Sequence, residues 1–259
     1  MSILFFDIDG TIFDGDPQGI RPNVIKAIHE TQQKGHICMI CSGRPYSFIA
    51  DNVKAIGFDG YVLANGAQVL YHDHNIVTHT FDQKKVKAFA ADFDAHDYEY
   101  IIATSKRAYL KKSYVWMEEF YKTCNIETEK FIRDFQEEDY LNDVVKMELR
   151  FKSQKAIPHI TKLTEGYDFL YEDGGMGLGE ISCQGVDKGK GILETLKALN
   201  IPLSESYCFG DGANDLEMFK TVAHPIAMGN AIPAIKDLAE QICDTVANDG
   251  VASKLRELF

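Results

Sequence analysis

The sequence has little positive charge for its length. Its 259 residues include 27 Lys and Arg against 39 Asp and Glu, which gives a formal net charge of −12 at pH 7. Proteins that bind the nucleic-acid backbone present a broad basic surface, so we expect no nucleic-acid partner. An anionic ligand would need a locally positive site on this acidic chain.

Long apolar runs are also missing. No stretch approaches the roughly 20 apolar residues that cross a bilayer, so we expect no membrane partner. The first residues, Met1 to Phe6, lead straight into apolar sequence without a basic leader or a small-residue cleavage site. These features predict a cytoplasmic protein. Its 45% hydrophobic residues are enough to bury the core of one large domain or two smaller ones.

Cysteine and histidine give only weak metal or redox signals. Cys38 and Cys41 form a C-x-x-C pair, but no second pair follows at zinc-site spacing and no helix opens on the first cysteine. Both lie in an apolar run, so buried free thiols are the simpler interpretation. His72 and His74 could chelate a metal, but a polar turn between two strands explains them more simply.

The beginning of the chain alternates short apolar strands with helices. Pro22 opens a helix that closes at Gly35, which matches the preference for Pro at the start and Gly after the end of helices. The expected strands are 2–6, 36–41 and 61–64, and a second helix should run from Pro45 to about Ile56. This alternation predicts an α/β fold with a doubly wound, mainly parallel sheet, whose ligands bind beyond the carboxyl ends of the strands.

The pattern changes near Phe81 and returns after residue 184. A helix over 82–95 and alternating segments at 99–103, 108–111, 147–151, 167–171 and 178–183 indicate a half-exposed antiparallel sheet with helices, including one at 157–163. Residues 185–259 then resume the first pattern, with helices at 188–199, 231–239 and 251–258 and strands at 207–209 and 225–228. We therefore predict a core of residues 1–81 and 185–259 that carries an inserted α+β domain of residues 82–184.

Polar and charged residues follow four predicted strand ends or helix starts. They are Asp7-x-Asp9-Gly10-Thr11, Ser42-Gly43, Lys188 and the segment Gly210-Asp211-Gly212-Ala213-Asn214-Asp215. A calcium loop is not expected at the first of them, because Ile12 and Phe13 cannot supply the further oxygen ligands. Loops at one edge of a parallel sheet converge on one crevice. A crevice with carboxylates, a hydroxyl, an ammonium and an amide suits phosphoryl transfer.

These motifs, in this order, resemble those of the haloacid dehalogenase superfamily over nearly the whole chain. The closest likeness is to its Cof-type hydrolases, which carry a large α/β cap between the second and third motifs, where residues 82–184 lie here. Three further segments resemble that subgroup: Asn65-Gly66-Ala67, Gly185-Val186-Asp187-Lys188-Gly189 and Asn248-Asp249-Gly250-Val251.

The resemblance implies a role for each core residue. Asp7 would be the nucleophile that forms an aspartyl-phosphate, and Asp9 would protonate the leaving oxygen and then deprotonate water. Mg²⁺ would be held by the Asp7 side chain, the Asp9 carbonyl and Asp211, with Asp215 supporting these ligands or capping a helix. The phosphoryl oxygens would meet donors from Ile8 and Gly43 backbone N–H, the Ser42 hydroxyl, the Lys188 ammonium and the Asn214 amide.

Other residues have a less specific interpretation. Lys190 is an alternative cation, but its place after Gly189 departs from the family pattern, so Lys188 is preferred. Thr11 is expected to stabilise its own loop. Arg44 could reach a second anionic group of the substrate or be solvated. The basic and aromatic stretch of Lys111, Lys112, Tyr114, Trp116 and Tyr121 could contact leaving groups, although such stretches are more often core or surface.

The resemblance predicts a Mg²⁺-dependent phosphatase of small phosphorylated metabolites, such as sugar phosphates or the cofactors pyridoxal phosphate and flavin mononucleotide. A phosphomutase of the same superfamily also needs the pair of Asp7 and Asp9. A non-catalytic phosphate-ligand sensor is the alternative outside enzymes, but such a protein should have lost some of the catalytic residues. A dehalogenase is not expected, because it would not need the Mg²⁺ site that Asp211 and Asp215 suggest.

Overall fold

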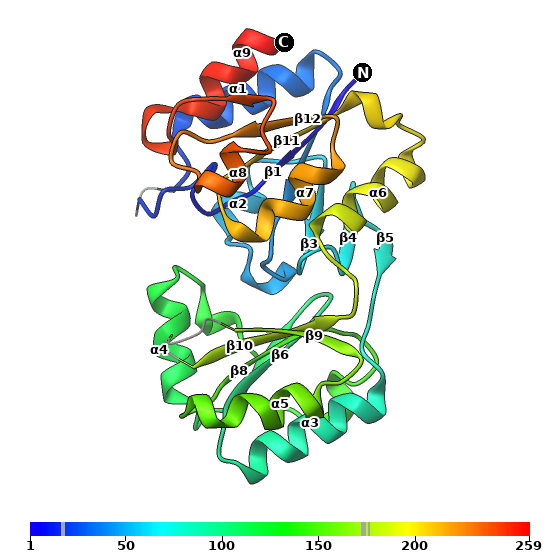
Figure 1. The fold of residues 1–259 in the computed structure, drawn as a ribbon, viewed down its shortest axis with the longest axis vertical. Helices are drawn as coiled ribbons and strands as arrows, with labels where there is room; N and C mark the ends of the chain where they lie inside the picture. The colour runs from blue at the N-terminus through cyan, green and yellow to red at the C-terminus, as the bar shows by residue number, and fades with distance from the viewer. Residues whose placement is uncertain (17–18, 172–174, 176) are drawn as a thin grey trace. The chain divides into compact units, whose positions relative to one another are not determined.

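The chain forms two compact units (Figure 1). The structure is a computed structural model, and it describes residues 1–16, 19–171, 175 and 177–259. The first unit contains Met1–Gly43, Asp51–Val77 and Asp187–Phe259, and the second contains Arg44–Ala50 and Thr78–Val186. Among the described residues, no helix is both long enough and apolar enough to cross a membrane.

The first unit is built on an eight-stranded sheet. Its order is β13-β12-β11-β1-β2-β3-β4-β5, and the neighbouring pairs from β13 to β3 are all parallel, whereas β3 and β4 are antiparallel. The strands are β1 (Ile3–Phe6), β2 (Ile37–Cys41), β3 (Gly60–Leu63), β4 (Gln68–Tyr71), β5 (His74–Thr78), β11 (Ser206–Gly210), β12 (His224–Ala227) and β13 (Gln241–Ile242). The predicted doubly wound, mainly parallel α/β fold is confirmed.

The central strands are buried because helices surround them. Every residue of β1 and β2 is buried, as expected for strands covered on both faces. In Figure 1, α1 runs beside α9, and the two helices are in contact, as are α6 and α7. The helices of this unit are α1 (Pro22–Gln33), α2 (Asp51–Lys54), α6 (Lys188–Leu199), α7 (Leu216–Thr221), α8 (Pro233–Lys236) and α9 (Gly250–Leu258).

The second unit has a separate antiparallel sheet in the order β7-β6-β8-β10-β9. Figure 1 shows α3 and α5 along one side of this sheet and α4 at its end. Two apolar clusters hold these layers, one containing Phe89 and Phe93 of α3 with Ile160 of α5, the other containing Met117 and Tyr121 of α4. The elements are α3 (Gln83–Ala95), β6 (Glu99–Thr104), β7 (Ala108–Leu110), α4 (Val115–Thr123), β8 (Val144–Arg150), α5 (Ile157–Leu163), β9 (Tyr167–Tyr171) and β10 (Leu178–Cys183).

Two predicted helices are shorter than expected. The helix from Pro45 to about Ile56 is wrong as one element, because a 3₁₀ turn at Tyr46–Phe48 gives way to extended backbone at Ile49, with ψ at 117°. Phe48 packs in the second unit against Tyr121, and this packing overrides the local helix signal. The helix predicted from residue 231 begins only at Pro233, because the residue before a proline is held in extended backbone.

The weak cysteine and histidine signals are resolved by the fold. Cys38 and Cys41 are fully buried within β2, and burial raises the pKa of both thiols, so the interpretation as core thiols is confirmed. His72 and Asp73 have φ of 44° and 62° and form the turn between β4 and β5. The predicted polar turn is therefore confirmed for His72, whereas His74 is the first residue of β5.

Candidate active site

Asp7 and Asp9 lie in a tight loop directly after β1. Phe6 is in register with Phe209 of β11 and Ile40 of β2, so Asp7 emerges between the ends of two parallel neighbours. The Ile8 carbonyl accepts hydrogen bonds from the backbone N–H groups of Thr11, Ile12 and Phe13, which turns the chain back on itself. The loop leaves Asp7 only 5% exposed but leaves Asp9 at the surface.

Lys188 joins two carboxylates beneath this loop. Its Nζ atom lies 2.6 Å from Oδ1 of Asp7 and 2.6 Å from Oδ1 of Asp215, and all three side chains are buried. Lys188 is the first residue of α6, whose N-cap Asp187 accepts a hydrogen bond from the Lys190 backbone N–H. The structure therefore places the Lys188 ammonium against the predicted nucleophile, whereas the backbone of Lys190 serves the helix cap.

Asp215 also organises the loop that follows β11. Its Oδ2 atom accepts from the backbone N–H groups of Asp211 at 2.9 Å and Gly212 at 3.0 Å, while Oδ1 faces Lys188. The bond from Gly212 is that of a cap on the 3₁₀ turn Ala213–Asp215, because Gly212 is the N-cap residue of this turn. The capping role expected for Asp215 is therefore seen in the structure, whereas its support of Mg²⁺ ligands stays a prediction.

Asp211 is held from the opposite side of the site. Thr11 Oγ1 donates to Asp211 Oδ1 at 2.9 Å, and Gly10 has φ of +81° beside the same carboxylate. A Cβ atom at position 10 would lie 2.2 Å from Asp211 Oδ2, so only glycine leaves room for the carboxylate. The loop after β1 therefore packs closely against the Asp211 carboxylate, which belongs to the loop after β11.

The loops after β2 and β3 complete this edge of the sheet. Ser42 is 2% exposed, and a Cβ atom at Gly43 would lie 2.8 Å from Asn65 Oδ1 and 3.7 Å from Asn214 Nδ2. Asn65 lies in a short left-handed segment with φ of 53°. The structure thus brings the predicted phosphate ligands Gly43 and Asn214 close together, although the predictions of phosphate contacts stay predictions.

The electrostatics of the cluster favour a bound cation. Burial raises the pKa of the Asp7 carboxyl to about 7, with Asp215 adding to the rise and Lys188 opposing it. Burial also raises the pKa of Asp211. For Lys188, burial alone would lower the pKa, but Asp7 and Asp215 outweigh it and raise the pKa. Three carboxylates against one ammonium leave an excess of negative charge that a divalent cation would neutralise.

The oxygen positions also fit a small divalent ion. Asp7, Asp211 and Asp215 each offer a carboxylate oxygen, and the three atoms lie within 4.8 Å of one another. Oxygens bound to one Mg²⁺ ion are separated by at most about 4.2 Å, so small side-chain adjustments suffice. Because both oxygens of Asp215 already have partners, Asp7 and Asp211 are the better candidates for direct ligands.

Several contacts at the site were not predicted from the sequence. The Thr11 hydroxyl donates a hydrogen bond to Asp211, which is distant in the sequence. The expectation that this hydroxyl stabilises its own loop is therefore corrected. Asn230 Nδ2 donates to the Gly10 carbonyl at 2.8 Å and its Oδ1 accepts from the Val246 backbone N–H. The only sequence feature that could have pointed to Asn230 is that it is a polar residue shortly after a predicted strand. These contacts join segments far apart in the chain, so the spacing of residues in the sequence does not predict them.

The other candidates lie in the second unit. Arg44 donates to the carbonyl oxygens of Phe48 and Cys124, so it is not simply solvated. In the basic and aromatic stretch, the hydroxyl of Tyr121 donates to Glu148 at 2.6 Å and Lys111 pairs with Asp94, while Lys112 is exposed. Its remaining members Tyr114 and Trp116 are partly buried, with Tyr114 donating to Asp94 and Trp116 stacked on Phe120.

A second group of possible metal ligands, Asp92, His96 and His159, links α3 and α5 in this unit. His159 Nε2 lies 2.9 Å from Asp92 Oδ2, and His96 Nδ1 lies 3.2 Å from Asp92 Oδ1. Both histidines are exposed. Their contacts with Asp92 explain why the three side chains lie close together without a metal ion.

The fold and the site define a class of protein: an α/β protein with a mainly parallel sheet and an acidic, lysine-containing site at the carboxyl edge of that sheet. The chain belongs to the haloacid dehalogenase-like hydrolases, because the model of that family matches residues 4–255. It is therefore a hydrolase of a superfamily that the sequence motifs already indicated.

Curated relatives align over almost their whole length. YkrA of Bacillus subtilis (strain 168), provisionally named a phosphatase, is 27% identical over 99% of this chain and 97% of its own length. The 5-amino-6-(5-phospho-D-ribitylamino)uracil phosphatase YcsE of the same organism is 25% identical over 99% of this chain and 95% of its own.

Solved structures show the same fold. A sugar phosphatase of haloacid dehalogenase subclass IIB is 25% identical, with a TM-score of 0.81 over 100% of this chain and 99% of that chain. A hypothetical protein of Geobacillus kaustophilus is 23% identical, with a TM-score of 0.87 over 99% of this chain and 98% of that chain.

Proposed function

We propose that the protein is a Mg²⁺-dependent phosphatase that hydrolyses small phosphate monoesters through a covalent intermediate on Asp7. The observation that carries this proposal is the buried contact of Asp7 with Lys188, beside Asp211 and Asp215, at the carboxyl ends of β1 and β11. Membership of a hydrolase family, and relatives named as phosphatases, support the reaction class.

In the first step, an oxygen of the Asp7 carboxylate attacks phosphorus. A bond forms between this oxygen and phosphorus, and the bond from phosphorus to the ester oxygen breaks. Asp9 donates its proton to the departing oxygen, so the leaving group departs as a neutral alcohol. Asp9 is suited to exchange protons with substrate and solvent because it lies at the surface of the loop.

In the second step, water removes the phosphoryl group from Asp7. Asp9, now ionised, takes a proton from the water as its oxygen attacks phosphorus, and the bond between Asp7 and phosphorus breaks. Inorganic phosphate leaves, and both aspartates return to their starting forms. Two displacements at a positioned carboxylate replace one difficult attack by water.

The donors around Asp7 stabilise the transferred group. The Lys188 ammonium is held against Asp7 in the structure, where it would meet a phosphoryl oxygen without reorganisation. We assign the remaining phosphoryl contacts to Ser42, Asn214 and the backbone N–H groups of Ile8 and Gly43. Asp215 positions Lys188 and the Asp211 backbone through its two oxygens.

The cation has a defined place in this proposal. Asp7, the Asp9 carbonyl and Asp211 would hold Mg²⁺, which when bound supplies the positive charge that lets a carboxylate approach a phosphate dianion. Thr11 and Gly10 keep Asp211 in position for this task.

We assign catalysis to the first unit and selection of the leaving group to the second, following the predicted division into core and cap. The similar proteins named above include a phosphatase of a ribitylaminouracil phosphate and a sugar phosphatase. Substrates with a polyol or sugar leaving group are therefore the first to test. The cytoplasmic location expected from the sequence stays a prediction.

The proposal is tested by phosphate release from a panel of phosphorylated sugars, cofactors and nucleotides, with Mg²⁺ and with a chelator. The native protein is compared with Asp7→Asn, and Asp51→Asn at the exposed start of α2 serves as the matched control. We expect release to require both Mg²⁺ and Asp7, with Asp51→Asn as active as the native protein.

Covalent catalysis has its own readout. A rapidly quenched reaction should yield protein that carries one phosphoryl group on the peptide containing Asp7, detected by mass spectrometry. Release that is as fast in Asp7→Asn as in the native protein would contradict the nucleophile. Isomerised monophosphate in place of free phosphate, from a labelled sugar bisphosphate, would instead identify a mutase.

A further inference from the structure

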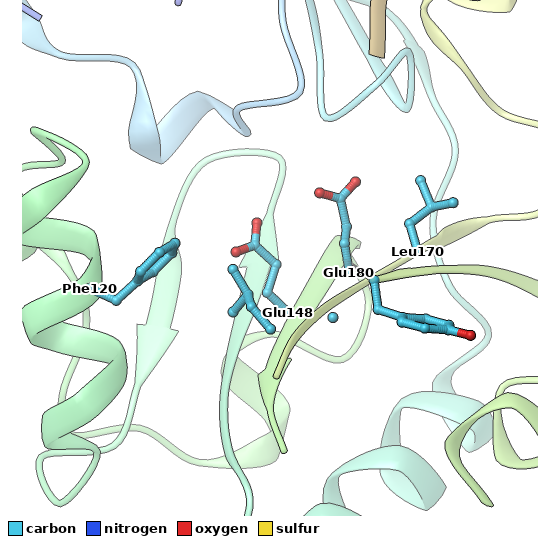
Figure 2. A pocket seen from close by; sticks show the side chains of 7 residues that line it. Phe120, Glu148, Leu170 and Glu180 are labelled. Carbon is cyan, nitrogen blue, oxygen red and sulfur yellow. The ribbon is translucent and has the colours of Figure 1, made fainter. Parts of the chain in front are cut away.

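The two faces of the sheet in the second unit carry different side chains. Glu148 and Glu180 line a pocket on one face, and Figure 2 shows their carboxylates projecting in the same direction. Their sequence neighbours Met147 and Ile181 point to the other face, because successive side chains of a strand alternate. On that face they join an apolar cluster that includes residues of α3 and α5. The two helices are therefore held by one common core.

Asp92, His96 and His159 form a bridge between these two helices at the surface. Asp92 and His96 are four residues apart at the end of α3, so they lie on the same face of that helix. His159 belongs to α5, and its Nε2 atom lies 3.0 Å and 2.9 Å from the two carboxylate oxygens of Asp92. Phe93 and Ile160, the neighbours of two of these residues, are buried in the common core. The bridge is therefore built on rigid elements.

The nitrogen and oxygen atoms of this group have the spacing of ligands around one small ion. His96 Nδ1 lies 3.2 Å from Asp92 Oδ1, and the ring centroids of His96 and His159 are 4.7 Å apart. Each residue offers one ligand atom, and the three atoms lie within 4.8 Å of one another. Ligands bound to tetrahedral Zn²⁺ at roughly 2.0–2.1 Å are about 3.3–3.4 Å apart. Small side-chain rotations would therefore bring all three atoms to a common ion.

The surroundings of the group favour a cation. The C-terminal end of a helix carries partial negative charge, and the last turn of α3 contains no basic residue. The Asp92 side chain is only 19% exposed, so water screens its carboxylate incompletely. Buried Tyr98 stacks on His96 with ring centroids 5.5 Å apart, which restricts the imidazole. The ligand atoms are thus held in place before an ion binds.

The chemistry of the ligands selects the ion. Two imidazole nitrogens and one carboxylate oxygen suit Zn²⁺, whereas Mg²⁺ and Ca²⁺ prefer oxygen ligands alone. The side chains of His96 and His159 are 44% and 46% exposed, which leaves room for water as a fourth ligand. A neutral imidazole carries one proton, so on binding the proton of each coordinating nitrogen moves to the other nitrogen of its ring.

We propose that Asp92, His96 and His159 form a zinc site that joins α3 to α5 and stabilises the second unit. All three ligands come from this unit, so the site needs no residue of the first. The inference does not rest on the proposed function, because none of the steps assigned to Asp7 and Asp9 involves this site.

The first test is zinc affinity, measured by competition with a chromophoric chelator. Metal-free protein is titrated at neutral pH in excess Mg²⁺, which competes for the carboxylates of the first unit. His159→Gln keeps a hydrogen-bond donor beside Asp92 but lacks the imidazole, and His96→Asn makes the same change at the second ligand. Each variant should bind Zn²⁺ about tenfold more weakly or less tightly still. His74→Gln, at an exposed histidine outside the group, should bind as the native protein does.

The second test is the stability of the second unit. An ion that binds only the folded state raises the midpoint of unfolding. The urea transition is followed by the fluorescence of Trp116, which lies in α4 of the same unit. Without zinc, His159→Gln should unfold close to the native midpoint, because it changes an exposed residue and keeps a polar contact. With zinc, the native protein and His74→Gln should shift to higher urea and His159→Gln should not.

The outcomes separate this site from the acidic site of the first unit. Native zinc affinity in both His159→Gln and His96→Asn would overturn the proposal, and the group would then serve only as ion pairs between helices. Zinc that is lost in Asp211→Asn and kept in the histidine variants would belong to the first unit and would also overturn it. Loss of zinc in the histidine variants, with phosphate release in Mg²⁺ unchanged, supports the zinc site and leaves the proposed function to its own test with Asp7→Asn.

Discussion

Asp7 must be ionised to attack phosphorus, yet the fold places it where ionisation is costly. Burial raises the pKa of its carboxyl to about 7, against an ordinary value of 3.8. Between about pH 4 and pH 7, Asp7 is therefore protonated in the folded protein but ionised in the unfolded chain. Because the folded state binds more protons than the unfolded state over this pH range, the contribution of Asp7 to the free energy of unfolding must fall as the pH rises.

This linkage predicts a pH-dependent difference between the native protein and Asp7→Asn. In the presence of a chelator, the free energy of unfolding of the native protein should fall relative to the variant from pH 5 to pH 7 and level off above. Urea denaturation followed by circular dichroism at several pH values measures the difference. A native protein that gains stability relative to Asp7→Asn over this range would contradict the direction of the pKa shift.

Gly10 provides a sharper probe of how Asp211 is positioned. A Cβ atom at this residue would lie 2.2 Å from Asp211 Oδ2, so Gly10→Ala should displace the carboxylate and weaken Mg²⁺ binding. We expect the Mg²⁺ concentration for half-maximal activity to rise tenfold or more, on the order of the loss seen when a supporting contact of a metal ligand is removed.

Gly15 is the matched control for this prediction. It has φ of +84°, close to the +81° of Gly10, but nothing lies within 4 Å of a Cβ atom built there. Gly15→Ala should therefore cost about 1–2 kcal/mol of backbone strain and leave the Mg²⁺ requirement unchanged. An equal change in Mg²⁺ requirement for both variants would show that backbone strain, and not the contact with Asp211, is responsible.

At the scale of elements, the residues after β2 show how packing overrides a helix signal. Phe48 is 4% exposed, and its ring centroid lies 5.0 Å from that of Tyr121 and 5.4 Å from that of Phe131. Phe48→Ala should destabilise the second unit by about 3–5 kcal/mol, because it leaves a cavity in this cluster. Val115→Ala, at a residue that is 64% exposed in the same unit, should change stability by less than about 0.5 kcal/mol.

The single tryptophan makes this effect measurable in one unit. Trp116 lies in α4, stacked on Phe120 at 5.3 Å between ring centroids, so its fluorescence reports on the second unit. The midpoint of its urea transition should shift to lower urea in Phe48→Ala. A transition at the native midpoint would mean that Phe48 contributes little to the second unit, despite its burial.

The elements that could be predicted from the sequence are those with a strong local signal. Helix α6 was predicted at its observed bounds, because Asp187 caps it and Gly185 precedes it in a turn. Parallel strands bring their carboxyl ends to one edge whatever their exact bounds, so the gathering of Asp7 and Asp211 followed from strand order alone. Lys188 begins helix α6 and follows no strand of this sheet, so strand order did not place it.

Contacts that depend on tertiary register could not be predicted. Thr11 and Asp211 are 200 residues apart, and nothing in the local sequence of either indicates the other. The pairing of Glu148 with Glu180 depends on a strand register that a one-residue slip would destroy. Sequence spacing therefore identified the chemistry of the site, while the structure was needed for the groups that hold it in place.

At the scale of the whole molecule, net charge sets how an anionic substrate approaches. The formal charge of −12 repels a phosphate dianion over distances comparable to the Debye length, which is about 10 Å at 0.1 M salt. Added salt screens this repulsion, whereas the contacts of Lys188 are buried and weakly screened. We expect kcat/KM to rise by about twofold between 20 and 200 mM KCl in saturating Mg²⁺, through a lower KM at constant kcat.

Steady-state kinetics of sorbitol 6-phosphate hydrolysis at constant pH measure this effect. A kcat that is independent of salt separates substrate approach from any change in the chemical step. Sodium chloride in place of KCl should give the same curve, since screening depends on ionic strength and not on the ion. A fall in kcat/KM with salt would instead show that the local positive field of the site outweighs the net charge, and that the acidic surface does not govern substrate approach.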